Sequence, residues 1–237
     1  MKLLVSPQSF AEAKVCIQSE VDIIDVKRPI EGSLGANFPW IIRDIAKLSP
    51  KKIPISATLG DVSFQPGTIS LAALGAATAG ASFVKVGLFA IKSMQQGIEL
   101  MSRVKQTIDE FNFTTAVVAA GYAEGEKIGS LDPLKIPTIA AKSNSDYAML
   151  DTYHKENGKS LFDILSLSTL KEFIHLAREY KLGIALGGSL KIEHIPQLQN
   201  LQPEIIGIRG AVCEQGDRLQ GKMSLKLIKE FQRALLE

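Results

Sequence analysis

Eight short apolar segments with the composition of buried strands recur along the chain, and amphipathic segments separate them. The clearest helical segments are 90–110, 168–180 and 224–235, and Ser168 is the expected N-cap of the second. Each strand–helix unit takes about 30 residues, and eight parallel strands of this kind close into a barrel. The sequence therefore predicts an α/β fold, a single (βα)8 TIM barrel that occupies residues 1–237. The expected strands are 3–5, 22–27, 53–58, 83–86, 115–119, 148–151, 183–186 and 205–208.

The composition limits the classes of partner. The chain has 27 basic and 25 acidic side chains, so neither nucleic acid nor an anionic membrane is expected as a partner. Cys16 and Cys213 lie far apart and form no redox or metal-ligand spacing, which is typical of a reduced cytosolic protein without disulfides. No segment has the features of an export signal, a membrane span or a zinc site. We therefore expect a cytoplasmic protein without a bound metal.

Three lysines stand at or just beyond the ends of expected strands, where burial of an ammonium group costs several kcal/mol unless it is paired or neutralised. They are Lys27, Lys85 and Lys155. Asp25 shares a strand face with Lys27, and Asp151 ends the sixth strand. Barrel enzymes place their sites at the C-terminal ends of the strands, so we expect these five side chains to line one cavity.

This mixture of amines and carboxylates indicates imine chemistry. Desolvation and a neighbouring cation lower the pKa of a lysine and free its amine to attack a carbonyl group as a Schiff base. Nearby carboxylates favour the charged form, so one lysine is expected to form the imine while another transfers protons. The alternative is that these residues are structural ion pairs that fill the interior of the barrel.

A phosphate anchor is expected in the loops after the seventh and eighth strands, a common position for phosphate in barrel enzymes. Glycine lets the backbone approach an oxyanion closely, and arginine adds charge and a planar pair of donors. Ordinary turns are the alternative interpretation. The candidate residues are Gly187, Gly188, Ser189, Arg209 and Gly210.

Three further features have open roles. The loop 32–35 follows the second strand and could cover the substrate or bind a second phosphate. Asp61 follows the third strand and is another carboxylate at the mouth of the barrel. The apolar segment 72–79 could pack on the barrel or on a second subunit, so a homo-oligomer is possible.

The segments around these lysines resemble a known family. They read Asp-Val-Lys-Arg-Pro from residue 25, Glu-Gly-Ser-Leu-Gly-Ala from residue 31, Phe-Val-Lys-Val-Gly from residue 83 and Leu-Asp-Thr-Tyr-His-Lys from residue 150. Together they resemble the (5-formylfuran-3-yl)methyl phosphate synthases of methanofuran biosynthesis, over essentially the whole chain.

The resemblance implies a lyase of C1-carrier metabolism that condenses two molecules of glyceraldehyde 3-phosphate into 4-(hydroxymethyl)-2-furancarboxaldehyde phosphate. It also implies that Lys27 is the Schiff-base lysine and Lys85 the proton acceptor, with Asp25, Asp151 and Lys155 assisting. No cofactor is expected, because the imine serves as the electron sink. A sugar phosphate is the expected small-molecule partner.

Other functions fit the same residues. Class I aldolases and pyridoxal phosphate synthase also use imine lysines on barrels, and a non-catalytic phosphate sensor is an alternative of another class. The orotidine-phosphate decarboxylase group carries a further aspartate three residues after the lysine, and the chain has Ile30 there. That difference counts against the decarboxylase group.

Overall fold

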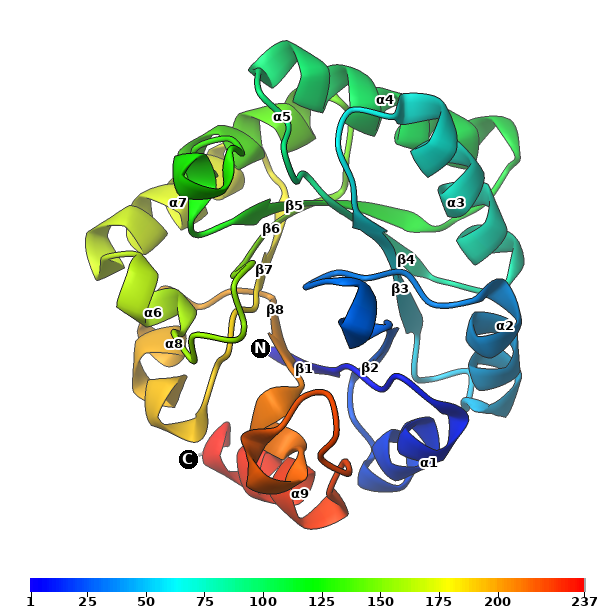
Figure 1. The fold of residues 1–237 in the computed structure, drawn as a ribbon, viewed down its shortest axis with the longest axis vertical. Helices are drawn as coiled ribbons and strands as arrows, with labels where there is room; N and C mark the ends of the chain where they lie inside the picture. Colours follow the sequence, from blue (N-terminus) through cyan, green and yellow to red (C-terminus); the bar gives the residue numbers. More distant parts are fainter. Residues whose placement is uncertain (237) are drawn as a thin grey trace.

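The computed structural model describes residues 1–236 and confirms the closed barrel of eight parallel strands (Figure 1). Each strand pairs with the next one in the sequence, and β8 returns to pair with β1. The helices form a ring outside the barrel. The strands are β1 (Lys2–Val5), β2 (Ile23–Val26), β3 (Ile55–Asp61), β4 (Phe83–Gly87), β5 (Ala116–Tyr122), β6 (Tyr147–Asp151), β7 (Gly183–Leu186) and β8 (Ile205–Ile208).

The strand boundaries differ from the predicted ones mainly at the ends that carry the site. β3 continues to Asp61 and β5 to Tyr122, so both side chains belong to the barrel wall. β2 ends at Val26, one residue before Lys27. The amide of Lys27 donates to the carbonyl of Pro7 at 3.2 Å, and its carbonyl accepts from the Asn37 side chain at 3.1 Å. The backbone of Lys27 is therefore held firmly although it lies outside the strand.

The helices cover the outside of the barrel through apolar faces. Two predicted helix starts were wrong. Ala90 has a φ of 54°, which ends the extended chain in a turn, and the helix begins after Ser93, whose hydroxyl accepts from the Gln96 amide. The next long helix has Ser166, and not Ser168, as its N-cap. The helices are α1 (Phe10–Ser19), α2 (Pro39–Leu48), α3 (Pro66–Thr78), α4 (Met94–Glu110), α5 (Ile136–Lys142), α6 (Leu161–Ile164), α7 (Leu167–Glu179), α8 (Ile195–Leu201) and α9 (Leu225–Ala234). Short 3-10 turns are η1 (Pro29–Glu31), η2 (Gly125–Ile128), η3 (Pro133–Lys135), η4 (Ile192–His194), η5 (Gly210–Val212) and η6 (Glu214–Gly216).

Apolar side chains fill two layers. The larger layer lies between the strands and the helices, and a smaller cluster fills the inside of the barrel. Leu4, Ile23, Val118, Met149 and Ile205 belong to this inner cluster. Charged side chains occupy the inside of the barrel nearer its C-terminal end, so the apolar cluster forms the floor beneath them.

The loop between β2 and α2 lies across the mouth of the barrel, where Figure 1 shows its blue turn inside the ring of helices. The hydroxyl of Ser33 donates to the carbonyl of Thr152 at 2.8 Å, and the amide of Leu34 donates to the carboxylate of Asp61 at 3.0 Å. Gly32 has a φ of 147°, and a Cβ atom there would collide with Asp61. These contacts hold the loop over the mouth.

Surface and sulfur chemistry add little to the site. None of the helices within residues 1–236 has the length and apolar character needed to cross a membrane. Cys16 and Cys213 are buried, and each is a free thiol. In α3, Ala73 and Ala76 pack on the barrel, whereas Leu71 is exposed.

Candidate active site

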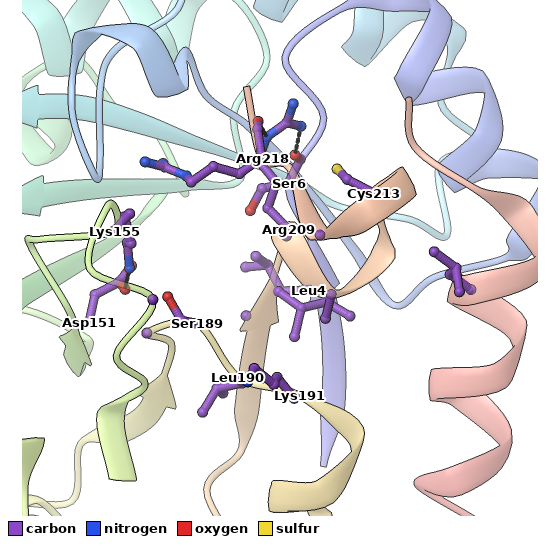
Figure 2. Close-up of a pocket in the computed structure, with 18 of the residues that line it drawn as sticks. Leu4, Ser6, Asp151, Lys155, Ser189, Leu190, Lys191, Arg209, Cys213 and Arg218 are labelled. Carbon is purple, nitrogen blue, oxygen red and sulfur yellow. Dashed lines mark hydrogen bonds and ion pairs between the residues drawn. The ribbon is translucent and has the colours of Figure 1, made fainter. Parts of the chain in front are cut away.

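A cavity of about 610 Å³ opens at the C-terminal end of the barrel (Figure 2). Its walls come mainly from the loops that follow β6, β7 and β8. Lys27, Lys85, Asp151 and Lys155 line it, so the structure brings together the lysines that the sequence placed on three different units. A cavity of this volume lies within the usual range of small-molecule sites.

Lys85 and Asp25 form a buried ion pair at the floor of this cavity. Lys85 Nζ lies 2.7 Å from Asp25 Oδ2, and the two side chains are 3% and 0% exposed. The Ser6 hydroxyl also donates to Asp25 Oδ2, at 2.9 Å. Burial raises the pKa of Asp25, but the charges of Lys85 and Lys27 outweigh it and hold this pKa below its ordinary value. Asp25 is therefore a carboxylate whose charge is balanced by lysine.

Lys155 and Asp151 form a second ion pair on the wall of the cavity. Lys155 Nζ also donates to the Thr152 hydroxyl at 2.8 Å, and the Thr152 amide donates to Asp151 at 2.8 Å. Burial raises the pKa of Asp151, but the charges of Lys155 and Lys27 together lower it by more than burial raises it, so the net shift is downward. Burial also lowers the pKa of Lys155, against the opposing effect of Asp151. The loop that carries Lys155 is anchored by Glu124, which accepts from the amides of residues 153 and 154 at 2.9 Å.

Lys27 differs from the other two lysines because it has no carboxylate within 4.0 Å among residues 1–236. Its side chain is 7% exposed and lines the cavity. Burial lowers the pKa of Lys27 to about 7, although Asp151 and Asp25 oppose this shift; Lys85 adds to it. A large fraction of Lys27 is therefore a neutral amine near pH 7, the form that attacks a carbonyl carbon.

The expected phosphate loops present free backbone donors. Within residues 1–236, the cavity-lining amides of Gly188, Ser189 and Leu190 donate to no other protein group, and those of Gly210 and Ala211 begin η5, where the turn offers them no acceptor. Gly188 and Ser189 have φ values of 103° and 49°, which turn the chain so that successive amides stay unpaired after β7. Figure 2 shows the Ser189 side chain directed into the cavity. The amide of Gly187 instead donates to the carbonyl of Leu150.

Arg209 has a different geometry from the one expected of a phosphate ligand. Its guanidinium donates to the Glu12 carboxylate at 2.7 Å, the Ser6 carbonyl at 2.7 Å and the Arg218 carbonyl at 2.7 Å. A fourth N–H donates to Glu12 at 3.3 Å. Arginine has five N–H donors, so one is left for a ligand. The positive charge predicted to hold phosphate is thus already balanced by Glu12, and the sequence could not reveal this partner.

Comparison with known proteins identifies the family of the chain. Residues 3–232 match the family model described as 4-HFC-P synthase. The chain belongs to this family. It is 50% identical over 231 residues to the (5-formylfuran-3-yl)methyl phosphate synthase of Methanocaldococcus jannaschii, with 98% of each chain covered. The resemblance seen in the sequence is therefore confirmed, and the chain is a member of a synthase family.

Solved structures support the fold of this 4-HFC-P synthase family member. Phosphoribosyl anthranilate isomerase from Thermotoga maritima superposes with a TM-score of 0.69 at 16% identity, over 100% of this chain and 98% of that one. A 3-hexulose-6-phosphate synthase superposes with a TM-score of 0.66 at 19% identity, over 98% and 99% of the two chains. At these identities the likeness extends to the barrel fold alone.

Asp61 is a residue of this 4-HFC-P synthase family member whose role the sequence left open. Its carboxylate accepts hydrogen bonds from the Tyr122 hydroxyl and the Leu34 amide. Burial raises the pKa of Asp61, and these hydrogen bonds oppose the shift. Gly87 lies beside the pair, where a Cβ atom would collide with both Tyr122 and Asp61. Asp61 therefore fixes the loop over the mouth, from a position close enough for Lys27 to lower its pKa.

Arg218 is one of the cavity residues that the sequence analysis missed. It lies ten residues after β8, in the loop between η6 and α9, and its side chain is half-buried in the cavity. No strand end or motif marks the position; a basic residue in a loop rich in glycine and polar residues was the only signal. Within residues 1–236, no three or more His, Cys, Asp or Glu side chains form a cluster that could hold a metal ion.

Proposed function

We propose that the chain condenses two molecules of glyceraldehyde 3-phosphate into 4-(hydroxymethyl)-2-furancarboxaldehyde phosphate, as a lyase of methanofuran biosynthesis that acts in the cytoplasm. Membership of the 4-HFC-P synthase family supports an enzyme that builds this type of product. The observation that carries the mechanism is the pairing of two lysines with carboxylates while Lys27 stays unpaired among residues 1–236.

The atoms balance without an oxidant or reductant. Two triose phosphates contain the product, one molecule of phosphoric acid and two molecules of water. The enzyme must therefore form a carbon–carbon bond, eliminate one phosphate and dehydrate a ring. A Schiff base supports these steps because it withdraws electrons from the carbon next to the former carbonyl group.

In the first step, the neutral amine of Lys27 attacks the carbonyl carbon of one triose and water leaves. The departing hydroxyl takes a proton from the Lys85 ammonium and leaves as the water, and the neutral Lys85 amine then removes a proton from the carbon adjacent to the imine. The resulting enamine expels the phosphate of the same triose. The carbon that carried this phosphate then attacks the carbonyl carbon of the second triose, whose phosphate is retained.

Lys155 and Asp151 occupy the wall beside this reaction and supply the remaining proton transfers. The ammonium group of Lys155 protonates departing oxygen atoms, and the Asp151 carboxylate takes up protons that leave carbon and passes them to Lys155. The free amides of residues 188–190, 210 and 211 hold one phosphate group. This phosphate is retained in the product and keeps the intermediate in place through successive steps.

The test is incubation of the purified protein with glyceraldehyde 3-phosphate alone. We expect a furan aldehyde absorbance and one released phosphate per furan. Lys27→Ala should abolish both, whereas Lys171→Met, which changes an exposed lysine on α7, should retain full activity. A requirement for ammonia or a pentose phosphate would support a pyridoxal-type synthase instead. Reversible cleavage of a larger sugar phosphate would support an aldolase, and binding without turnover would support a sensor.

A further inference from the structure

The proposed reaction involves two phosphate groups, yet the free amides of the β7 and β8 loops form one anion site. Arg218 occupies a different part of the cavity. Its Nη2 atom lies 3.4 Å from the carbonyl of Gly32, in the loop that crosses the mouth. Gly32 in turn lies against Asp61 at the end of β3. The guanidinium therefore reaches across the mouth to the side opposite β7.

The side chain points away from its own loop. Figure 2 shows Arg218 extended toward Lys155. It lies close enough to Lys27 to lower the pKa of that lysine, and close enough to Asp151 for that carboxylate to raise the pKa of Arg218. Arg218 has no carboxylate within 4.0 Å among residues 1–236. Its planar donor pair is thus open to an anion above the reacting carbons.

The backbone around Arg218 is fixed even though the loop lies at the surface. The carbonyl of Arg218 accepts from Arg209 Nε at 2.7 Å. An antiparallel backbone β-bridge between Cys213 and Met223 closes the loop, and the Glu214 amide donates to the Lys222 carbonyl at 2.9 Å. Arg209 is itself held by Glu12, so a buried ion pair positions the backbone from which Arg218 extends. A pre-organised anion site requires a fixed backbone and a guanidinium group that is not already paired with a carboxylate, and Arg218 has both.

We propose that Arg218 forms a second phosphate subsite, which binds the phosphate group that the reaction releases. This inference rests on the proposed function and adds the ligand class and the residue. In the elimination step, which precedes the attack on the second triose, a base removes a proton from the carbon adjacent to the imine, and the bond between the next carbon and the phosphate oxygen breaks. The electron pair leaves with that oxygen, and the cation at Arg218 stabilises the charge that develops there. The exposed rim of its loop gives the phosphate a path to solvent.

The test is to count the molecules of glycerol 3-phosphate that bind to each chain. This compound carries a phosphate group but has no carbonyl group, so it cannot react. We expect calorimetry to give two molecules per wild-type chain and one per Arg218→Met chain. In the variant, the lost site should be weakened by about 10- to 100-fold, the size expected for a charge-assisted donor pair. Arg218→Lys should weaken the site less. Arg103→Gln removes an exposed arginine on α4 and should leave two sites.

Turnover gives an independent measure. Addition of guanidinium ion should restore part of the activity lost in Arg218→Ala, which a purely structural role would not allow. One glycerol 3-phosphate per wild-type chain, or two per Arg218→Met chain with unchanged affinity, would overturn the inference. Because the count needs no reaction, it decides the role of Arg218 even if the wild-type protein makes no furan. An absence of furan together with two sites would contradict the proposed function alone.

Discussion

Lys85 Nζ lies 2.7 Å from Asp25 Oδ2 in a pair almost fully removed from solvent, while Lys27 lies two residues after Asp25 without a partner within 4.0 Å among residues 1–236. This asymmetry separates two kinds of lysine in one cavity. A carboxylate partner favours the charged form of a lysine, whereas burial without a partner favours the neutral amine, which is the nucleophile. The assignment of the imine to Lys27 depends on this difference.

The effects of substituting Lys85 and Asp25 on the free energy of unfolding should be strongly coupled. Lys85→Met leaves the Asp25 carboxylate buried without its cation, and we expect a loss of about 3–5 kcal/mol in the free energy of unfolding. The double variant Asp25→Asn with Lys85→Met removes both charges and should lose much less. Chemical denaturation of the two single variants and the double variant measures the coupling. Losses that simply add would show that the two groups do not interact in the protein.

Lys27→Met should stabilise the protein while it abolishes activity. The pKa of Lys27 falls from its ordinary value of 10.5 to about 7 on folding, so the folded state binds fewer protons between these two values. The contribution of Lys27 to the free energy of unfolding therefore rises with pH between these two pKa values. Below pH 7 the folded state bears the full free-energy cost of burying the charged ammonium group. We expect Lys27→Met to raise the free energy of unfolding by about 1–2 kcal/mol at pH 6. The gain should vanish near pH 10, and an equal gain at both pH values would contradict the assigned pKa.

The pH dependence of kcat/KM should have an acid limb near pH 7, because activity rises as Lys27 loses its proton. Asp151 raises the pKa of Lys27 and Arg218 lowers it. Asp151→Asn should therefore move the limb to lower pH, and Arg218→Met should move it to higher pH. The substrate is the same in each profile, so its own phosphate titration cannot produce opposite shifts. Shifts in one common direction would contradict this account.

Gly87→Ala should damage the mouth of the barrel, because the added Cβ atom collides with Tyr122 and Asp61. The hydrogen bond between those residues would break, and the loop that contains Leu34 would lose its anchor. We expect a loss of about 1–3 kcal/mol in stability, of the size seen when a packed site is overfilled, together with reduced activity. Gly75→Ala is the matched control, because it lies inside α3 with open space around its Cβ position. That control should be neutral or slightly stabilising, and equal losses in both variants would contradict the proposed role of Gly87.

The barrel was readable from the sequence because buried parallel strands and amphipathic helices alternate with few insertions. Four of the five expected residues line the cavity, namely Lys27, Lys85, Asp151 and Lys155, and the sequence indicated them because they stand at or just after strand ends. Asp25 was expected to line the cavity too, but it is fully buried beneath Lys85. The sequence did not reveal which charges pair. Asp25 lies on β2 and Lys27 directly follows that strand, yet Asp25 pairs with Lys85 from two strands away, because the tilt and stagger of the strands decide which side chains meet inside.

The residues that escaped prediction depend on loop paths. Arg209 was expected to bind phosphate, but Glu12, near the other end of the chain, already holds its guanidinium. The carbonyl of Arg218 accepts from Arg209, so the same contact also positions the backbone of Arg218. Glu12 and Arg209 are 197 positions apart in the sequence, and no local pattern encodes their contact.

The most direct test of the central claim is borohydride reduction during incubation with glyceraldehyde 3-phosphate, followed by peptide mass analysis. We expect a single reduced adduct on Lys27, with none on Lys85 or Lys155. Lys27→Ala should give no adduct, and Lys171→Met should give the same adduct as the wild-type protein. An adduct on another lysine, or one that persists in Lys27→Ala, would contradict the account.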